Sequence, residues 1–325
     1  MARALVIGGT LLIGRTLVEQ PLARGAEVVI MHRGHGTPFG TRVREIQCDR
    51  NDVSAVASSL SHEQFDVVYD NVYDWQRGTS AEQVCAAAIA CAKGLRRYVF
   101  TSSVAVFAPG GPYNEDSALV PLDFPNAYGA QKADSERALF ALGRAQGLPV
   151  TTIRPAFIFG PHNAFDREAF FWDRIVAGRP VIIPGDGLST MQWISSRDVA
   201  RAAIASTEHD VAIGRGYNVA NVPEITQLDF VRLLARVAGK DVTLVHVPRE
   251  TIAALGGGIM EPPLYFGAFL DIPPITVRND RLRTDLELEL TPLEDGLQET
   301  FRWYASQQRP TPDFSWDDTA IAAVG

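Results

Sequence analysis

The sequence predicts an α/β fold of the Rossmann type, in which a doubly wound parallel sheet is followed by a smaller C-terminal substrate-binding region. Three observations predict it. Strand and helix patterns alternate through the first 155 residues, a glycine turn separates the first strand from the first helix, and pieces interrupted by proline and glycine follow. We therefore expect a Rossmann domain over residues 1–155 and a mainly substrate-binding region over 156–325, from which segments near 195–220 return to the sheet.

Short apolar runs mark the strands of the first half. The run Ala4–Ile7 precedes the glycine turn, and helical spacing then extends to Arg24. Thr79 and Glu82 have the spacing of a capping box, which predicts the start of an alanine-rich helix. Further strands are expected at residues 27–31, 44–48, 65–69 and 97–100.

The later elements follow less regular patterns. Helical spacing from about Asn126 to Gln146 predicts a long helix, and a strand opens at Pro149, where a proline is tolerated. The segments Ser196–Ala203 and Gly216–Val219 have the patterns of a helix and a strand that rejoin the sheet. A last helix is expected at residues 293–304, followed by a loose terminus after residue 308.

The composition is that of a soluble globular chain. Of its 325 residues, 46% are hydrophobic and 21% charged, and no apolar run is long enough to span a bilayer. The start of the chain runs directly into a strand, so we expect a cytoplasmic protein with no membrane partner. A net charge of −8 argues against a nucleic-acid partner. Cys48, Cys85 and Cys91 have neither disulfide nor metal-ligand spacing, so buried thiols and no metal site are expected.

The glycine turn has the position of a dinucleotide-binding turn. Its glycines allow the backbone to approach a pyrophosphate, and the helix that follows presents an N-terminus that favours negative charge. The middle glycine of the usual fingerprint is missing, so a purely structural turn is the alternative interpretation. The residues expected to contact the cofactor here are Gly8, Thr10, Leu11, Leu12, Ile13 and Gly14.

The end of the second strand predicts which dinucleotide is bound. The acidic residue that would bind a ribose diol is absent, and Arg33 stands where it can bind a 2′-phosphate instead. NADP is therefore preferred over NAD, with a solvated loop arginine as the alternative. Asp49 and Arg50 follow the third strand and are expected to receive the adenine edge.

A tyrosine, a lysine and a serine indicate the chemistry. Tyr128 and Lys132 are four residues apart, so they share one face of a helix, where the ammonium favours the phenolate of the tyrosine. Ser103 ends an apolar strand and can hydrogen-bond the same substrate oxygen, as hydride transfer at a secondary alcohol carbon requires. The alternative is a surface lysine beside a half-buried tyrosine.

Taken together, these residues resemble the extended short-chain dehydrogenase/reductase superfamily, and within it the NAD(P)-dependent epimerase/dehydratase family. The resemblance covers nearly the whole chain and implies an NAD(P)-binding Rossmann domain, with Tyr128 as acid/base, Lys132 lowering its pKa and holding the nicotinamide ribose, and Ser103 orienting the substrate oxygen. The matching marks, besides the glycine turn and these residues, are Arg154-Pro155, Gly160-Pro161, Ile183-Pro184-Gly185-Asp186-Gly187 and Pro292-Leu293-Glu294-Asp295-Gly296-Leu297.

Several departures from the family pattern bear on the substrate. The stretch Val104–Phe107 stands where the family's 4,6-dehydratases carry an Asp-Glu pair, which disfavours dehydration. Phe157 lies in the stretch where sugar-nucleotide enzymes place an asparagine, and Gln192 lies where a family arginine binds nucleotide phosphate. These departures count against a UDP-type sugar. The variant glycine turn with Arg33 instead resembles an atypical branch of the family that includes epimerase-like proteins of uncertain substrate and some chloroplast proteins reported to bind RNA.

The segment after the fourth strand predicts a differently shaped pocket. Asp70-Asn71-Val72-Tyr73 replaces the small, alanine-rich segment usual under the cofactor, so Asn71 is expected to contact the cofactor. Trp75 and Trp193 are further candidates for the pocket, with core packing as the alternative for either. The residues expected to contact the substrate are Tyr73, Ser103, Phe157 and Gln192.

These observations predict an NAD(P)-dependent oxidoreductase or epimerase that handles a secondary alcohol or ketone of a small-molecule substrate, such as a sugar or sugar nucleotide. One alternative is an NADPH-dependent ketoreductase that acts on a non-nucleotide substrate. The remote alternative is a nucleotide-bound binding protein without turnover. In similar proteins the helices around Ala81–Cys91 and Asn126–Gln146 form dimer faces, so the resemblance also allows a homodimer.

Overall fold

The computed structural model describes residues 2–34, 36–165, 167–257 and 272–325. These residues form two compact units, and the chain passes from one unit to the other several times. Unit 1 contains Met1–Ala156, Ser196–Ala220 and Val277–Leu290, and unit 2 contains Phe157–Ser195, Asn221–Thr276 and Thr291–Gly325. The return of residues 277–290 to unit 1 is a crossing that the sequence patterns did not indicate.

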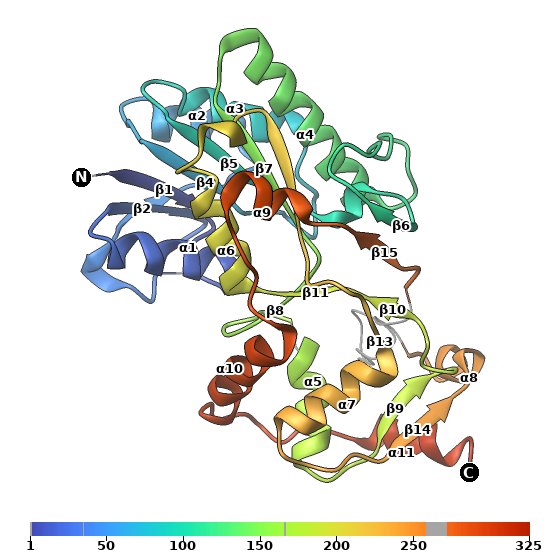
Figure 1. The fold of residues 1–325 in the computed structure, drawn as a ribbon. Helices are drawn as coiled ribbons and strands as arrows, with labels where there is room; N and C mark the ends of the chain where they lie inside the picture. Colours follow the sequence, from blue (N-terminus) through green and yellow to red (C-terminus); the bar gives the residue numbers. More distant parts are fainter. Residues whose placement is uncertain (1, 35, 166, 258–271) are drawn as a thin grey trace. The chain divides into compact units, whose positions relative to one another are not determined.

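Unit 1 is built on a seven-stranded parallel sheet (Figure 1). The strands lie in the order β12-β7-β5-β4-β1-β2-β3, so the sheet grows outward in both directions from β1. This confirms the doubly wound Rossmann fold predicted from the sequence. The bounds are β1 (Arg3–Ile7), β2 (Glu27–His32), β3 (Arg44–Gln47), β4 (Val67–Asp70), β5 (Arg97–Thr101), β7 (Val150–Pro155) and β12 (Arg215–Val219).

Helices cover both faces of this sheet (Figure 1). On one face α2, α3 and α4 pack in series, and on the other α1 packs against α6, which contacts α9. Strands enclosed in this way read as continuous apolar runs, as β1 does with Leu5, Val6 and Ile7 fully buried. The bounds are α1 (Leu12–Ala23), α2 (Val53–Leu60), α3 (Ala81–Ala90), α4 (Ala127–Gln146), α6 (Ser196–Ala205) and α9 (Asp280–Leu286), with the short elements η1 (Gly40–Arg42), η2 (Val104–Val106), η3 (Asp210–Ala212) and β6 (Gly110–Tyr113).

Unit 2 has its own hydrophobic core between helices and short strand pairs. The ring of Trp193 stacks on that of Phe230, with centroids 4.2 Å apart, and both side chains are buried. The strand pairs are β8 (Phe157–Phe159) with β11 (Trp193–Ser195), β9 (Val181–Pro184) with β14 (Leu244–Val247), and β10 (Thr190–Met191) with β13 (Ile225–Thr226). The helices are α5 (Arg167–Val176), α7 (Gln227–Val237), α8 (Arg249–Ala254), α10 (Leu293–Ala305) and α11 (Ser315–Ala322), and β15 (Ile275–Val277) crosses from unit 2 to unit 1.

Two local predictions are wrong. The capping box of α3 is formed by Ser80 and Gln83, one residue later than the pair predicted from the sequence, and Ser80 Oγ accepts from the Gln83 backbone N–H. The tail is not loose up to its end, because α11 packs into unit 2 and its Asp317 forms a buried ion pair with Arg174 at 2.8 Å. Among the helices of the described residues, none is long and apolar enough to cross a membrane.

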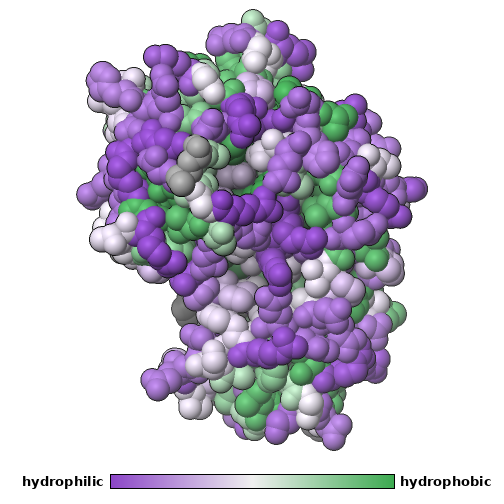
Figure 2. Space-filling view, turned by 60° about the vertical axis from the view of Figure 1, so that its left-hand side comes forward, coloured by the Kyte–Doolittle hydropathy of each residue, from purple (hydrophilic) through white to green (hydrophobic). Residues whose placement is uncertain are grey.

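Polar and charged residues predominate on the face that Figure 2 shows, and apolar residues lie there in small groups. Such scattered apolar residues are usual on protein surfaces.

The packing of α4 against η2 depends on Gly129. A Cβ at this position would lie 2.1 Å from the backbone oxygen of Ala105, so only glycine allows the helix to approach the turn this closely. The helix begins at the cap residue Asn126, whose side chain accepts from the Gly129 N–H at 3.3 Å.

We expect Gly129→Ala to lower the free energy of unfolding by about 2 kcal/mol or more, because backbone must move to relieve the overlap. Gly143→Ala in the same helix is the matched control. Its Cβ would meet only the Leu148 oxygen at 3.0 Å, and the better helix propensity of alanine offsets about 1 kcal/mol of that strain. Urea denaturation of both variants measures the difference, and equal losses would contradict the assignment of a special contact to Gly129.

Candidate functional site

The segments that carry most of the predicted cofactor and catalytic residues of unit 1 follow neighbouring strands at one edge of the sheet. β1, β4 and β5 are neighbours and end in register, since Ile7 pairs with Asp70 and Asp70 pairs with Phe100. The segments that follow these strands therefore leave from the same edge. This is the carboxyl edge, where open α/β sheets bind ligands.

The glycine turn is tight for steric reasons. A Cβ on Gly8 (φ +85°) would lie 2.2 Å from Val72 Cγ2, and one on Gly14 would lie 1.8 Å from the Gly8 oxygen. Among the described residues, the first turn of α1 has neither a side-chain cap nor an acidic residue of its own, so no capping side chain satisfies its first N–H groups. The turn and this helix N-terminus fit the pyrophosphate of a dinucleotide, whose charge the uncapped N–H groups would bind.

The remaining residues of the predicted turn surround this helix start. Leu11 is exposed, Thr10 and Leu12 are half-buried, and Ile13 is buried in the core. Asn71 lies beside the turn, because its Nδ2 is 3.2 Å from the position of a Cβ on Gly14. The structure thus brings Asn71 to the glycine turn, whereas the Ile13 side chain packs into the interior.

Arg33 is part of a cluster of four charges. Its Nη1 lies 3.2 Å from Asp74 Oδ2, and its side chain is 57% exposed. Arg77 bridges the same Asp74 oxygen and Asp49, each at 2.7 Å. Hydrogen bonds from the backbone and side chain of Arg77 lower the pKa of Asp74 to about 2, so this carboxylate stays ionised at neutral pH. Arg33 is therefore exposed but already ion-paired.

Arg50 does not reach the ligand edge with its side chain. It is 4% exposed, its Nη2 donates to Asp70, and its Nη1 donates to the Gln83 oxygen at 2.7 Å. The prediction that Arg50 receives an adenine edge is corrected accordingly, because the buried Asp70 carboxylate draws the guanidinium inward.

Ser103 and Tyr128 come from neighbouring pieces of backbone. Ser103 caps η2, and its Oγ accepts from the Ala105 N–H at 3.1 Å, which leaves the hydroxyl proton to be donated elsewhere. Tyr128 lies in the first turn of α4, half-buried. Its ring stacks on Trp75 and meets Tyr73 edge-on, with both centroid distances 4.8 Å. Trp75 itself is 57% exposed, so it covers the tyrosine from the solvent side rather than filling a core.

Lys132 is buried one helical turn below Tyr128. Its Nζ donates to the Thr101 oxygen at 2.7 Å and lies 6.0 Å from the centroid of the Tyr128 ring. Burial lowers the pKa of this ammonium to about 8. The chain contains three lysines, Lys93, Lys132 and Lys240, and the other two are exposed.

Two residues that position the site were not predicted. Gly129 brings Tyr128 close to the turn of Ser103, as described above, and a glycine directly after the tyrosine was the available signal. Gln131 holds the segment 71–80 against α4, because its Oε1 accepts from the Tyr73 hydroxyl at 2.9 Å and from the Thr79 N–H at 3.1 Å. Nothing in the local pattern marks Gln131, since its partners lie more than fifty residues away.

The other two residues predicted to contact substrate belong to unit 2. Phe157 and Gln192 lie side by side, and the Phe157 N–H donates to the Gln192 oxygen at 3.2 Å. Phe157 is half-buried and Gln192 is buried. Trp193, a candidate for the pocket, packs instead in the hydrophobic core of unit 2.

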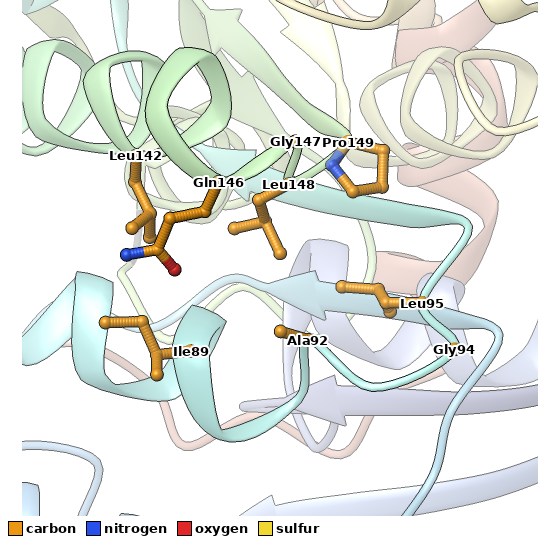
Figure 3. A pocket seen from close by; sticks show the side chains of 9 residues that line it. All are labelled: Ile89, Ala92, Gly94, Leu95, Leu142, Gln146, Gly147, Leu148 and Pro149. Carbon is orange, nitrogen blue, oxygen red and sulfur yellow. The ribbon is translucent and has the colours of Figure 1, made fainter.

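A small cavity lies at the opposite edge of the sheet in unit 1 (Figure 3). It measures about 140 Å³, and Ile89 and Ala92 face Leu142 and Leu148 across it. It adjoins the residues that precede β5 and β7, at the amino ends of these strands. This cavity is therefore separate from the edge that carries the candidate site.

Comparisons with known proteins identify relatives of the chain. In sequence, the chain is 29% identical over 266 residues to the chloroplast stem-loop binding protein of 41 kDa b of Arabidopsis thaliana, covering 76% of this chain and 67% of the relative. It is 25% identical over 341 residues to a dTDP-4-dehydro-6-deoxy-D-allose reductase of Streptomyces bikiniensis, covering 94% and 97%.

A third relative is much longer than this chain. A trifunctional UDP-glucose 4,6-dehydratase/UDP-4-keto-6-deoxy-D-glucose 3,5-epimerase/UDP-4-keto-L-rhamnose-reductase of Arabidopsis thaliana is 30% identical over 240 residues. The match covers 71% of this chain and 32% of the relative, so the chain spans about a third of that protein.

Fold and family comparisons agree with each other. The UDP-glucose 4-epimerase of Thermotoga maritima has the same fold, with a TM-score of 0.74, 20% identity and coverage of 93% of this chain and 98% of that one. The sequence profile of the NAD dependent epimerase/dehydratase family matches residues 4–220, about two thirds of the chain. The resemblance identified from the sequence is thereby confirmed: the chain belongs to the NAD dependent epimerase/dehydratase family.

Proposed function

We propose that this protein is an NAD(P)-dependent enzyme that oxidises or reduces a secondary alcohol or ketone, with Ser103, Tyr128 and Lys132 as its catalytic residues. The observation that carries the proposal is that Ser103 follows β5 at the carboxyl edge of the sheet in unit 1, that Gly129 packs the first turn of α4 with Tyr128 against the turn after Ser103, and that Lys132 Nζ donates to the Thr101 oxygen of the same strand end. Membership of the NAD dependent epimerase/dehydratase family supports it.

Each side chain has a distinct role in the proposal. Tyr128 gives its phenolic proton to the substrate oxygen during reduction and takes one back during oxidation. The Lys132 ammonium, 6.0 Å from the ring centroid, favours the phenolate of Tyr128. Ser103 donates its hydroxyl proton to the same substrate oxygen. A bound nicotinamide cofactor supplies or accepts the hydride.

The proposed substrate is a sugar or sugar nucleotide, handled by an epimerase or a reductase. Relatives named as sugar-nucleotide reductases and epimerases support this class. A small non-nucleotide ketone is the alternative, favoured by Phe157 and Gln192 at positions where the sequence departs from the sugar-nucleotide pattern. We propose that 4,6-dehydration is disfavoured, because Val104, Val106 and Phe107 after Ser103 are buried and apolar rather than acidic.

Tyr128→Phe tests the catalytic assignment. We expect turnover to fall by about two to four orders of magnitude, because the substitution removes the general acid/base and keeps the ring. Turnover is measured with NADPH or NADH and a panel of UDP- and dTDP-linked keto sugars and small ketones. Net consumption of the reduced cofactor indicates a reductase, and inversion of a sugar carbon without net consumption indicates an epimerase.

Tyr113→Phe is the control for this experiment, because Tyr113 is a half-buried tyrosine that stacks on Phe107 and has no proposed catalytic role. Unchanged turnover in Tyr128→Phe would overturn the assignment.

The proposed cofactor is NADP in preference to NAD, because Arg33 is exposed beyond the end of β2. Asp74 opposes this preference, since a 2′-phosphate would have to share Arg33 with that carboxylate. We therefore propose that Arg33 and Asp74 together set the affinity ratio of the two cofactors.

We expect Arg33→Ala to lower the ratio of NADP to NAD affinity about tenfold or more, which is the size of a lost charged hydrogen bond. Asp74→Asn should raise this ratio, because it frees Arg33 from its carboxylate partner. Fluorescence titration of NADPH and NADH measures both effects, with Arg96→Ala as a control on an exposed arginine at the amino end of β5. A ratio that is the same in all four proteins would remove Arg33 from the proposal.

Binding of a structured RNA is the second candidate function, and the similarity to a stem-loop binding protein favours it. The net charge of −8 opposes it, because phosphate contacts need excess positive charge. We expect fluorescence anisotropy with a labelled RNA hairpin at physiological salt to give a Kd no tighter than the non-specific range of about 10⁻⁶ M. Tighter binding that depends on hairpin sequence would favour the RNA function over the enzyme.

A further inference from the structure

Four polar side chains are buried together beneath the candidate site in unit 1. They are Arg50 after β3, Asp70 at the end of β4, Tyr98 in β5 and Lys132 in α4, and each is at most 4% exposed. Buried charges normally occur in pairs, because an isolated ion loses its hydration without compensation. Two cations and one carboxylate therefore share this interior.

Asp70 is fixed at the centre of the group. Its Oδ2 accepts from Arg50 Nη2 and from the Tyr98 hydroxyl, the latter at 2.7 Å. Its Oδ1 is buried and makes no hydrogen bond among the described residues. Arg50 is anchored in turn by the Gln83 oxygen, so the carboxylate cannot turn toward solvent. Asp70 is not explained by the glycine turn or by the three proposed catalytic residues.

Among the described residues, no carboxylate accepts a hydrogen bond from Lys132, and the surroundings of this side chain are largely aromatic. Its Nζ donates to the Thr101 oxygen and lies 4.5 Å from the Phe100 centroid. Burial is the largest influence on its pKa and lowers it, the charge of Asp70 raises it, and the charge of Arg50 lowers it. The other titratable groups that face Lys132 are Glu136, which is bonded to Arg154, and the phenols of Tyr73 and Tyr128.

We propose that Asp70 is the buried counter-anion that keeps Lys132 protonated, and that Arg50 and Tyr98 hold Asp70 in the position from which it does so. Asp70 is a positioning residue, since it acts on the chemistry through Lys132 and Tyr128. This inference rests on the proposed role of Lys132 in the reaction, but the electrostatic link between the two side chains can be measured without turnover.

The electrostatic link between Asp70 and Lys132 has a defined consequence for the pH at which Lys132 loses its proton. Lys132 carries its proton below about pH 8 and loses it above. Lys132 Nζ lies 4.5 Å from the centroid of Phe100, and Phe100 is the cross-strand partner of Asp70, so the ammonium lies beside the strand pair that carries the carboxylate. A nearby opposite charge raises the pKa of a cation, by about one unit or more at about 4–6 Å, so loss of Asp70 moves this limit toward neutral pH. Loss of the Arg50 charge moves it in the opposite direction. The alkaline side of a pH–rate profile should follow the same shifts.

The small number of lysines makes the measurement direct. Protein labelled with carbon-13 at the lysine ε position gives three signals by NMR, and Lys93→Arg and Lys240→Arg identify the signal of Lys132. In Asp70→Asn we expect the pKa of Lys132 to fall by about one unit or more, and in Arg50→Gln we expect it to rise. Lys93 and Lys240 are exposed and serve as internal references that should not shift.

Two comparisons separate the proposal from a general loosening of the fold. Loosening would raise the pKa of Lys132 toward the ordinary value of lysine in both variants, whereas the proposal requires opposite shifts. If Asp70→Asn does not fold, Arg50→Gln is compared with Tyr98→Phe: loosening would raise the pKa of Lys132 in both, whereas the proposal requires the larger rise in Arg50→Gln. Tyr98→Phe removes a hydrogen bond without changing charge and should shift Lys132 less than either substitution.

An unchanged pKa of Lys132 in folded Asp70→Asn, or a lowered one in Arg50→Gln, would overturn the inference. Failure of the proposed function has a different signature. If Lys132→Met retains full turnover while the NMR shifts occur as expected, the electrostatic link stands and the catalytic role of Lys132 does not. If Lys132→Met loses turnover but the NMR shifts do not occur in the other variants, the catalytic role of Lys132 stands and the electrostatic link to Asp70 does not.

Discussion

The contact between α4 and the turn after β5 is the constraint on which the candidate site depends. At Gly129 the helix backbone approaches the Ala105 oxygen more closely than any other residue type allows. This approach sets the first turn of α4, with Tyr128, beside the backbone that carries Ser103. It also directs Lys132 into the sheet, where Thr101 accepts its hydrogen bond. One close backbone contact thus sets the positions of a phenol, a hydroxyl and an ammonium.

Charges around this contact occur in two groups with different exposure to solvent. The inner group pairs Arg50 with Asp70 in the interior, where the effect of each charge on its neighbours is large. The outer group joins Arg33 and Arg77 to Asp74 near solvent, where water and salt weaken each pair. In the proposals above, the inner group bears on proton transfer and the outer group on the choice of cofactor, so the same pairing of arginine with aspartate would have two different physical effects.

Local patterns predicted most of the fold and rather less of the site. The alternating strands and the glycine turn are short-range signals, so the doubly wound sheet could be read from them. The inward direction of the Arg50 side chain could not be predicted from local patterns, because it depends on Asp70 in another strand. Helix α11 was not predicted for the same reason, since its Asp317 pairs with Arg174, which is 143 residues away in the sequence. The cap of α3 was misplaced by one residue because Thr79 and Ser80 are both good caps, and only the structure distinguishes them.

Hydrogen bonds hold the segment 71–80 in place near both of its ends. Gln131 holds Tyr73 and Thr79 against α4, and Asn51 after β3 donates to the Gly78 oxygen at 2.7 Å. Surface loops in general tolerate insertions and deletions, but adding or removing a single residue here would break one anchor or the other. Homologous chains can therefore vary the side chains of this segment, and so the face that it presents beside the tyrosine, far more readily than its length.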